Sequence, residues 1–240
     1  MSKRLNCAIS SITYFNAHTR RVVLDLPKGE PLSFKAGQYL EIMLTGKRCP
    51  FSIANSPHHT SSIELHVRPT ADSEDSVEIE ALLDSADKIE IDAPKGDCYI
   101  ESSPHKTLIL LAASTGITQM KSIYEYLMHL GHKEKVFLYW GVLTDSDLYL
   151  DELCKTWARE NKAFEYIPVV SAPDTSPNWN GRTGLVGNAV LEDFDDLANV
   201  MVYVSGGPGM VYATLDSFVA HGLSEENMYS DVFSYAPRSS

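Results

Sequence analysis

Cys49-Pro50-Phe51-Ser52-Ile53-Ala54-Asn55-Ser56-Pro57 is the stretch from which the fold is best deduced. Its apolar and small residues predict a short strand over residues 51–54. Pro50 has no amide donor, so we expect it to start this strand rather than to lie inside a paired one. Alternation turns Ser52 and Ala54 to one face, which forms a flat ledge with one hydroxyl and one methyl group. A planar heterocycle would fit such a ledge; the alternative is an ordinary barrel strand whose serine faces solvent.

Length and composition indicate a globular protein of one large or two modest domains, because 44% of the 240 residues are hydrophobic and 22% are charged. The net charge of −12 argues against nucleic-acid partners and against adsorption to an anionic membrane. The first residues lack the apolar core of a signal peptide, and no apolar run approaches the ~18 residues of a membrane span. We therefore expect a cytoplasmic protein. It has no disulfide framework or metal-ligand spacing, since its cysteines are scattered at Cys7, Cys49, Cys98 and Cys154.

Short strands separated by turn residues fill the chain from Asn6 to about Asp92. One helix interrupts them, over residues 75–83, with Ser73 or Asp75 as the expected N-cap. Six short strands at this spacing predict a small antiparallel barrel. The expected strands are 9–15, 19–26, 38–44, 51–54, 63–68 and 88–91.

Beyond residues 102–104 the pattern changes to buried strands that alternate with helices. Residues 107–112 form a continuous apolar run, which is typical of a strand buried on both faces of a parallel sheet. The alternation predicts a doubly wound α/β domain, so we divide the chain into domains 1–102 and 103–240. The other expected strands are 135–140, 164–169 and 200–204, and the expected helices are 116–130, 147–161, 185–191 and 208–221.

Two loops of small residues follow strands of this second domain. Ligands bind at such strand ends in open parallel sheets. Residues 112–118 run into a helix and would present backbone amides to a phosphate. Residues 205–210 contain adjacent glycines that permit close approach, and Pro208 suits a first helical position. The alternative for each loop is a tight turn that needs glycine only for its geometry. A Rossmann Gly-x-Gly-x-x-Gly fingerprint is absent, which argues against an ordinary dehydrogenase.

The Pro-Phe-Ser-Ile-Ala sequence at residues 50–54 resembles the flavin-binding strand of the ferredoxin-reductase-like superfamily. Within it the chain is most similar to the bacterial NAD(P)H:flavin oxidoreductases, including the flavin reductases that accompany luciferases. The resemblance implies an antiparallel Greek-key barrel for flavin, then a doubly wound nucleotide-binding domain, with hydride transfer from NADH or NADPH to flavin. Further motifs at similar positions are Phe34-Lys35-Ala36-Gly37-Gln38-Tyr39, Ile63-Glu64-Leu65-His66-Val67, Ala93-Pro94-Lys95-Gly96-Asp97, Tyr139-Trp140-Gly141 and Trp179-Asn180-Gly181-Arg182-Thr183-Gly184.

The same resemblance implies roles for individual residues. Ser52 would be the catalytic residue, with its hydroxyl hydrogen-bonded near flavin N5. Phe233, near the C-terminus, would cover the ring; its alternative is simple packing. The remaining flavin residues would be Pro50, Phe51 and Ile53, bordered by His66, Val67 and Arg68, while Ser114, Thr115, Gly116, Ile117, Thr118, Gly206, Gly207, Pro208 and Met210 would bind the nicotinamide nucleotide.

Three departures from the family pattern concern phosphate binding. Cys49 stands where the family usually has Arg, and strand alternation sends Arg48 to the opposite face. An acidic run over residues 72–78 replaces a Gly-x-x-Ser helix start, and Ala113-Ser114 replaces two glycines. The side-chain atoms of Ala113-Ser114 would crowd the pyrophosphate of the nucleotide. From the other two departures we expect FMN, FAD or riboflavin to be a dissociable substrate whose reduced form supplies other enzymes, such as a flavin-dependent monooxygenase.

Two alternatives remain from the sequence. One is an electron-transfer reductase with a resident flavin that serves an oxygenase or a cytochrome, and the other is a redox-silent binding subunit. A separate expectation concerns the nucleotide. Residues 142–147 contain no Lys or Arg for a 2′-phosphate, whereas Asp145 or Asp147 would accept a hydrogen bond from a 2′-hydroxyl. The sequence therefore predicts that NADH is used at least as well as NADPH.

Overall fold

The computed structural model describes residues 2–59 and 61–238 and divides into two compact units. The first unit comprises the chain up to Glu101 together with Lys121–Leu130. The second comprises Ser102–Met120 and the chain from Gly131 onward. Helix α2 (Ile117–His129) is thus shared: its start belongs to the second unit, and the rest belongs to the first. The sequence pattern does not reveal this sharing of one helix.

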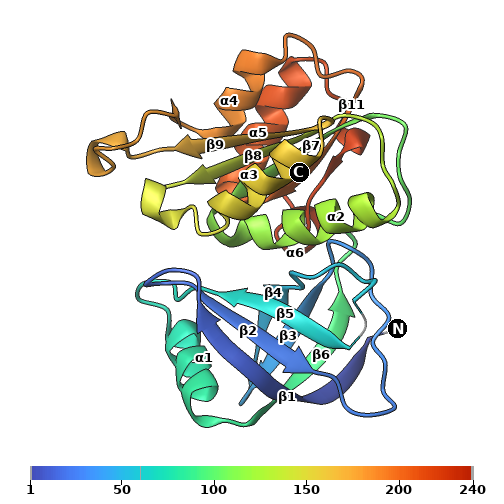
Figure 1. Ribbon diagram of the computed structural model, residues 1–240, viewed down its shortest axis with the longest axis vertical. Coiled ribbons are helices and arrows are strands. Elements are labelled where there is room, and N and C mark those ends of the chain that lie inside the picture. The colour runs from blue at the N-terminus through green and yellow to red at the C-terminus, as the bar shows by residue number, and fades with distance from the viewer. Residues whose placement is uncertain (1, 60, 239–240) are drawn as a thin grey trace. The chain divides into compact units, whose positions relative to one another are not determined.

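The first unit is a curled antiparallel sheet of six strands in the order β4-β3-β6-β1-β2-β5 (Figure 1). Two residues past the end of edge strand β4, the Ala54 amide donates to the carbonyl of Glu64, within the other edge strand β5, at 2.8 Å, which brings the two edges together. The predicted antiparallel barrel is confirmed. Its strands are β1 (Lys3–Tyr14), β2 (Arg20–Asp25), β3 (Tyr39–Leu44), β4 (Lys47–Ser52), β5 (Ser62–Val67) and β6 (Lys88–Lys95).

Alternate residues of these strands fill the barrel core, as the period of two requires. Each fully buried aliphatic side chain contributes roughly 1.5–3 kcal/mol through removal from water. Helix α1 (Glu74–Ser85) packs Ile79 and Leu83 into the same core, and the side chain of Ser73 caps it by accepting from the Ser76 amide. The residues with at most 1% exposure include Val22, Leu24, Leu40, Ile42, Ile63, Leu65, Ile89 and Ile91.

The position of Pro50 differs from the prediction. It lies inside β4, paired with Glu41 of β3, and the expected strand over residues 51–54 ends at Ser52. Strand β4 is at the edge of the sheet and has one hydrogen-bonded neighbour, so a residue without an amide donor is tolerated within it. The prediction was wrong because sequence alternation alone does not distinguish an edge strand from a central one.

The second unit is a parallel sheet in the order β10-β9-β8-β7-β11-β12, as the alternating pattern predicted. Strand order reverses between β7 and β11, which makes this the topological switch point. Figure 1 shows α4 and α5 together on one face of this sheet. The strands are β7 (Thr107–Ala113), β8 (Val136–Val142), β9 (Phe164–Val170), β10 (Arg182–Thr183), β11 (Val200–Ser205) and β12 (Met228–Tyr229).

The helices of the second unit mostly match their expected ranges. Helix α3 is an exception: it begins at Asp151 and not at residue 147, because Thr144 and Asp147 form a capping box that closes a separate 3₁₀ turn over Asp145–Asp147. No helix in the described ranges is long and apolar enough to cross a membrane. The helices are α3 (Asp151–Glu160), α4 (Val186–Asp193), α5 (Pro208–Ala220) and α6 (Val232–Tyr235), with further 3₁₀ turns at Ser114–Gly116, Pro173–Thr175 and Glu225–Asn227.

Candidate functional site

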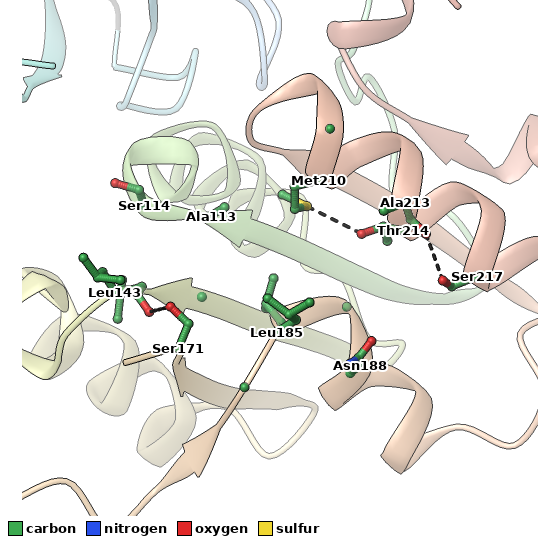
Figure 2. Close-up of a pocket in the computed structure, with 16 residues that line it drawn as sticks. Ala113, Ser114, Leu143, Ser171, Leu185, Asn188, Met210, Ala213, Thr214 and Ser217 are labelled. Carbon is green, nitrogen blue, oxygen red and sulfur yellow. Dashed lines mark hydrogen bonds between the residues drawn. The ribbon is translucent and has the colours of Figure 1, made fainter. Parts of the chain in front are cut away.

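A pocket of about 480 Å³ opens where β7, β8 and β9 end and where α4 and α5 begin. Figure 2 shows Leu143 and Leu185 on one side of it and Met210 on the other. Leu143 and Leu185 are 62% and 68% exposed and line the same pocket, so together they leave an apolar wall open to a ligand. The remaining lining residues are Ala113, Ser114, Gly141, Val142, Ser171, Gly184, Val186, Gly187, Asn188, Gly209, Ala213, Thr214 and Ser217.

Glycines let the walls of this pocket approach one another. A Cβ on Gly141 would lie 2.7 Å from the Cβ of Val186, so the start of α4 packs directly on β8. A Cβ on Gly116 would lie 2.3 Å from the Ser205 carbonyl, so the loop after β7 packs on the end of β11. Real side chains do not tolerate such distances. These glycines are required by packing, whatever ligand the pocket takes.

Ser114 has a strained backbone at the mouth of this pocket. Its φ of +50° lies in the left-handed region that favours glycine, and its side chain is exposed. The Ser114 carbonyl accepts a hydrogen bond from the Trp140 indole at 2.8 Å. Trp140 is completely buried, as expected of a packing residue, and it also fixes the loop after β7. The strained φ gives a physical reason for the glycine that the family usually has here.

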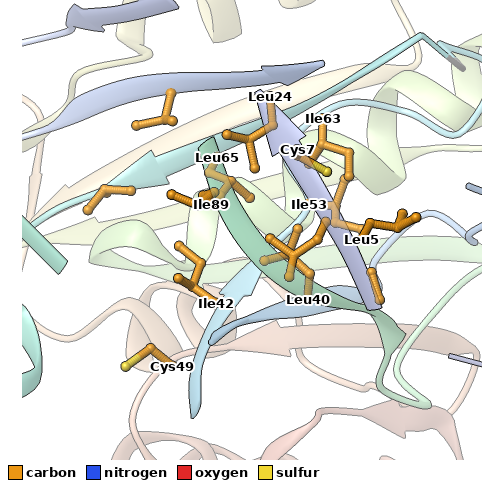
Figure 3. Packing of buried hydrophobic residues seen from close by; sticks show 14 of the residues in the cluster. Leu5, Cys7, Leu24, Leu40, Ile42, Cys49, Ile53, Ile63, Leu65 and Ile89 are labelled. Carbon is orange, nitrogen blue, oxygen red and sulfur yellow. The ribbon is translucent and has the colours of Figure 1, made fainter. Parts of the chain in front are cut away.

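The flavin strand identified from the sequence lies at the end of β4 in the first unit. Ser52 is half-buried, and its hydroxyl makes no hydrogen bond to another described residue. Ile53 is completely buried among Leu40 and Ile63 in the barrel core (Figure 3). Ala54 is also completely buried, so the expectation that it forms an open ledge with Ser52 was wrong. The chain leaves β4 after Ser52, and the alternation that placed Ala54 on that face ends there.

A small pocket of about 60 Å³ lies beside this strand, between β4, β5 and α1. Phe51 and Arg68 line it together with two carboxylates, Asp75 and Glu80. Cys49 also lines it and is buried, while Arg48 is exposed on the opposite face, as alternation predicted. Burial raises the pKa of the Cys49 thiol, and the nearby carboxylates of α1 raise it further. This position therefore offers no positive charge to a phosphate.

Lys47 partly offsets the acidic start of α1. Its ammonium lies 2.9 Å from an Asp75 oxygen and 3.0 Å from a Glu78 oxygen. The hydrogen bond to Asp75 raises the pKa of Lys47, and the hydrogen bond to Glu78 raises it further.

Among the residues described, no group of three or more His, Cys, Asp or Glu is arranged to hold a metal ion.

Comparison with known proteins identifies both units. Residues 6–99 match the oxidoreductase FAD-binding domain, and residues 110–216 match the oxidoreductase NAD-binding domain. The chain is 37% identical over 210 residues to a probable flavin reductase of Aliivibrio fischeri, which covers 85% of this chain and 88% of that protein. It is 31% identical over 238 residues to the NAD(P)H-flavin reductase of the same organism, covering 96% and 99%. The chain belongs to the NAD(P)H-flavin reductase family.

The fold of this reductase also matches a solved structure. The Amycolatopsis cytochrome P450 reductase GcoB superposes with a TM-score of 0.86 at 27% identity, covering 96% of this chain and 69% of that one. The resemblance found in the sequence is confirmed, and the chain is an NAD(P)H-dependent flavin oxidoreductase. The alternative of a redox-silent subunit is thereby set aside.

The structure brings together only some of the residues expected to bind the nucleotide in this reductase. Ser114 and Met210 line the large pocket. Pro208 is the first residue of α5, as predicted, Gly207 is its N-cap, and both are exposed. The side chains of Ile117 and Thr118 are buried, so only their backbone is left for a ligand, while Thr115, Gly116 and Gly206 are half-buried beside the lining.

Only some of the residues expected to border the flavin lie at the small pocket; the others are buried, exposed or in the second unit. Val67 and Arg68 line the small pocket, although Val67 is 2% exposed, and the His66 side chain is fully buried. Pro50 is exposed on the edge strand. Phe233 packs against Tyr212, with 5.7 Å between ring centroids, at the margin of the core of the second unit. That contact is what the packing alternative describes; the covering role of Phe233 stays a prediction.

Sequence reasoning missed most of the pocket wall formed by β8, β9 and α4. Leu143 and Ser171 follow the ends of two parallel strands, so the rule that ligands bind there would have found them. Residues 185–188 directly follow the Trp179–Gly184 motif that carried part of the resemblance, and Gly184 itself lines the pocket. Asp147, expected at the ribose, instead accepts from the Thr144 amide and hydroxyl at 3.1 and 3.0 Å and lies outside the lining.

Proposed function

We propose that this reductase uses flavin as a dissociable substrate, reduces it with a hydride from NADH or NADPH, and releases it to other enzymes. The observation that carries the proposal is the 60 Å³ pocket beside the flavin strand, which Asp75 and Glu80 line and in which Cys49 replaces the usual Arg. Arg68 is the one cation among the described lining residues, against two carboxylates, so these surroundings disfavour a phosphate on balance. Stacking and one or two hydrogen bonds remain, which support micromolar binding, near about −8 kcal/mol, rather than a nanomolar hold.

The cofactors supply the chemistry, namely transfer of a hydride from nicotinamide C4 to flavin N5. The protein supplies position, and productive transfer needs reacting atoms at roughly 3–3.5 Å. Ser52 is the residue proposed to hydrogen-bond near N5, because its half-buried hydroxyl has no other described partner. Phe51, half-buried against the barrel core, would contact the ring.

The large pocket is proposed to take the adenosine part of the nucleotide. Its apolar wall at Leu143 and Leu185 suits an adenine ring, and Ser171 and Asn188 offer hydrogen bonds to the ribose. The loop after β7 and the N-terminus of α5 present backbone amides, with Gly207 and Gly209 in open space, which suits the pyrophosphate. The fit therefore favours one extended nucleotide held along the strand ends.

Desalting followed by an absorbance scan near 450 nm tests the substrate mode. We expect a colourless or faintly yellow protein that shows saturation kinetics in added flavin under anaerobic conditions. FMN, FAD and riboflavin are supplied separately, with NADH oxidation as the readout. Flavin that stays bound stoichiometrically through the column would contradict the proposal.

That contrary outcome would favour the second candidate, an electron-transfer reductase with a resident flavin. The similarity to the Amycolatopsis cytochrome P450 reductase, with a TM-score of 0.86, favours it. A resident-flavin enzyme would reduce a cytochrome or an oxygenase component without added flavin. The two candidates therefore separate on whether electron transfer to a protein acceptor depends on free flavin.

A further inference from the structure

A buried ionic cluster in the first unit lies directly behind the end of the flavin strand. Its centre is the Glu64 carboxylate of β5, which is 11% exposed. The Arg21 guanidinium donates to one oxygen, with 2.9 Å from Nε, and the His66 ring donates to the other from Nε2 at 2.9 Å. The Lys121 ammonium of α2 lies 3.4 Å from that second oxygen and 2.9 Å from Glu125. Two cations therefore face two carboxylates.

The protonation state of the cluster follows from these contacts. Burial alone would raise the pKa of Glu64, but the hydrogen bond from His66 and the charge of Lys121 outweigh it and hold that pKa well below its usual range. Burial lowers the pKa of His66, so its ring is neutral and donates one N–H to Glu64. The cluster is balanced without a charge on His66, and the Lys121 ammonium has a hydrogen to spare for another acceptor.

That acceptor is the backbone of the flavin strand. The Lys121 ammonium donates to the Ala54 carbonyl at 3.2 Å, and the Ser122 hydroxyl donates to the Asn55 carbonyl at 2.9 Å. Ala54 is completely buried and follows Ser52 by two residues. The Asn55 side chain in turn accepts from the Glu64 amide at 2.8 Å. The residues that follow Ser52 are thus held from both sides, by β5 and by α2.

We propose that Lys121 is a positioning residue for flavin, which acts by fixing the Ala54 carbonyl and so the course of the chain after Ser52. This inference rests on the proposed function. Among the described residues, Lys121 is the one side chain that joins the Glu64 cluster to this carbonyl. Without it the carbonyl is buried and unpaired, a costly state that the strand relieves by moving. The Ser52 hydroxyl and the Phe51 ring move with the strand, so flavin contacts are lost.

The test compares Lys121→Met, which keeps the length and removes the ammonium, with Lys121→Arg, which keeps a charged donor. Lys135→Met is the matched control, because Lys135 pairs with Glu165 on the exposed surface of the second unit. Riboflavin and FMN dissociation constants are measured by quenching of flavin fluorescence, alongside KM for NADH and thermal unfolding.

We expect Lys121→Met to weaken binding of both flavins about tenfold, the effect of losing one charged hydrogen bond. KM for NADH should stay within about twofold, Lys121→Arg should recover most of the affinity, and Lys135→Met should match the parent. A merely structural lysine would lower the unfolding temperature and leave the flavin dissociation constants of the folded protein unchanged.

Unchanged flavin affinity in Lys121→Met would overturn the inference while leaving the proposed function intact. If that variant does not fold, Lys121→Gln replaces it; its shorter side chain removes the ammonium from the Ala54 carbonyl and should weaken flavin binding at least threefold. No change there would equally contradict the proposal. A parent protein that binds flavin in a Lys121-dependent way but does not reduce it would refute the proposed function alone.

Discussion

The pocket of the second unit and the flavin strand of the first differ in how much of their binding surface exists before a ligand arrives. The first is a cavity of about 480 Å³, walled by small and apolar side chains whose close packing depends on glycines. The second has about 60 Å³ of space and two carboxylates at its edge. A preformed apolar cavity lowers the cost of ordering on binding, whereas a ledge offers contacts on one side. The difference indicates unequal affinities for nucleotide and flavin.

The large pocket and the flavin strand also differ in which of their polar groups are hydrogen-bonded within the protein. Near the large pocket, Trp140 and Thr144 hold a backbone carbonyl and a carboxylate in place, while the cavity wall keeps polar side chains such as Ser171 and Asn188 among its apolar ones. At the flavin strand the Glu64 cluster holds the backbone from behind, and the Ser52 hydroxyl is left without a described partner. The hydroxyl is therefore the polar group with which this strand meets its ligand.

Replacing Ser52 should have the largest effect, and on turnover rather than on flavin binding. Ser52→Ala removes a hydrogen bond near the atom that gains the hydride, which costs about 1–3 kcal/mol in the transition state, or roughly 5- to 150-fold in kcat. Single-turnover reduction of saturating flavin under argon measures it. Ser52→Thr keeps the hydroxyl and serves as the control. A Ser52→Ala enzyme that reduces flavin at the parent rate would show that the hydroxyl has no catalytic role.

The nucleotide side of the comparison is tested by the choice between NADH and NADPH. Among the described residues, no Lys or Arg lines the large pocket, so a 2′-phosphate would find no positive partner there. We expect kcat/KM for NADH to equal or exceed that for NADPH. Ser171→Arg, which places a cation at the end of β9, should shift the ratio toward NADPH by about tenfold. A parent preference of tenfold or more for NADPH would contradict the assignment.

Both sheets could be predicted from the sequence, but the contacts that form the candidate sites could be predicted only in part. Alternation at residues 19–26 and the apolar run at 107–112 predicted both sheets, because a strand's side chains report which faces are buried. The sequence also correctly placed Pro208 at a helix start and Cys49 opposite Arg48. Helix starts and strand faces depend on residues close together in the sequence, so a local pattern predicts them. The wall formed by Leu185 and Asn188, the burial of Ala54 and the Lys121 contact could not be predicted, since they depend on segments brought together by topology.

Stability against acid should depend on one buried histidine in each unit, and replacing one histidine at a time separates the contributions of the two units. Burial lowers the pKa of His66 in the first unit and of His132 in the second. Below pH ~6.5 these histidines bind protons in the unfolded chain but stay neutral in the folded protein. The free energy of unfolding is therefore highest above that pH, and it falls as the pH drops toward the pKa values of the two histidines in the folded protein. The slope is at most about 1.4 kcal/mol per pH unit for each proton.

Thermal unfolding from pH 7.5 to 5.5 measures this slope in His66→Gln and His132→Gln. Each replacement should flatten the fall in unfolding temperature, because glutamine does not titrate. His66→Gln keeps a donor for Glu64 and should leave stability at pH 7.5 closest to the parent. The exposed His18 is the control position. A slope that neither replacement alters would show that other groups govern the acid response.

The smallest expected effect concerns the flavin phosphate, and it tests why the flavin side is the weaker one. FMN carries a phosphate that riboflavin lacks, so the difference between their KM values isolates the influence of charge. Asp75 lines the small pocket and pairs with Lys47, and Asp75→Asn makes the site one unit more positive. At low ionic strength the change is worth about 1 kcal/mol at most, so KM for FMN should fall up to about fivefold.

KM for riboflavin should not change, and Asp174→Asn, at an exposed carboxylate of the second unit, should affect neither flavin. Salt should remove the gain, because exposed charges are screened within about 10 Å at 0.1 M. If Asp75→Asn improved FMN and riboflavin equally, the carboxylate would act on the ring or the strand, and repulsion of the phosphate would not explain the weak flavin side.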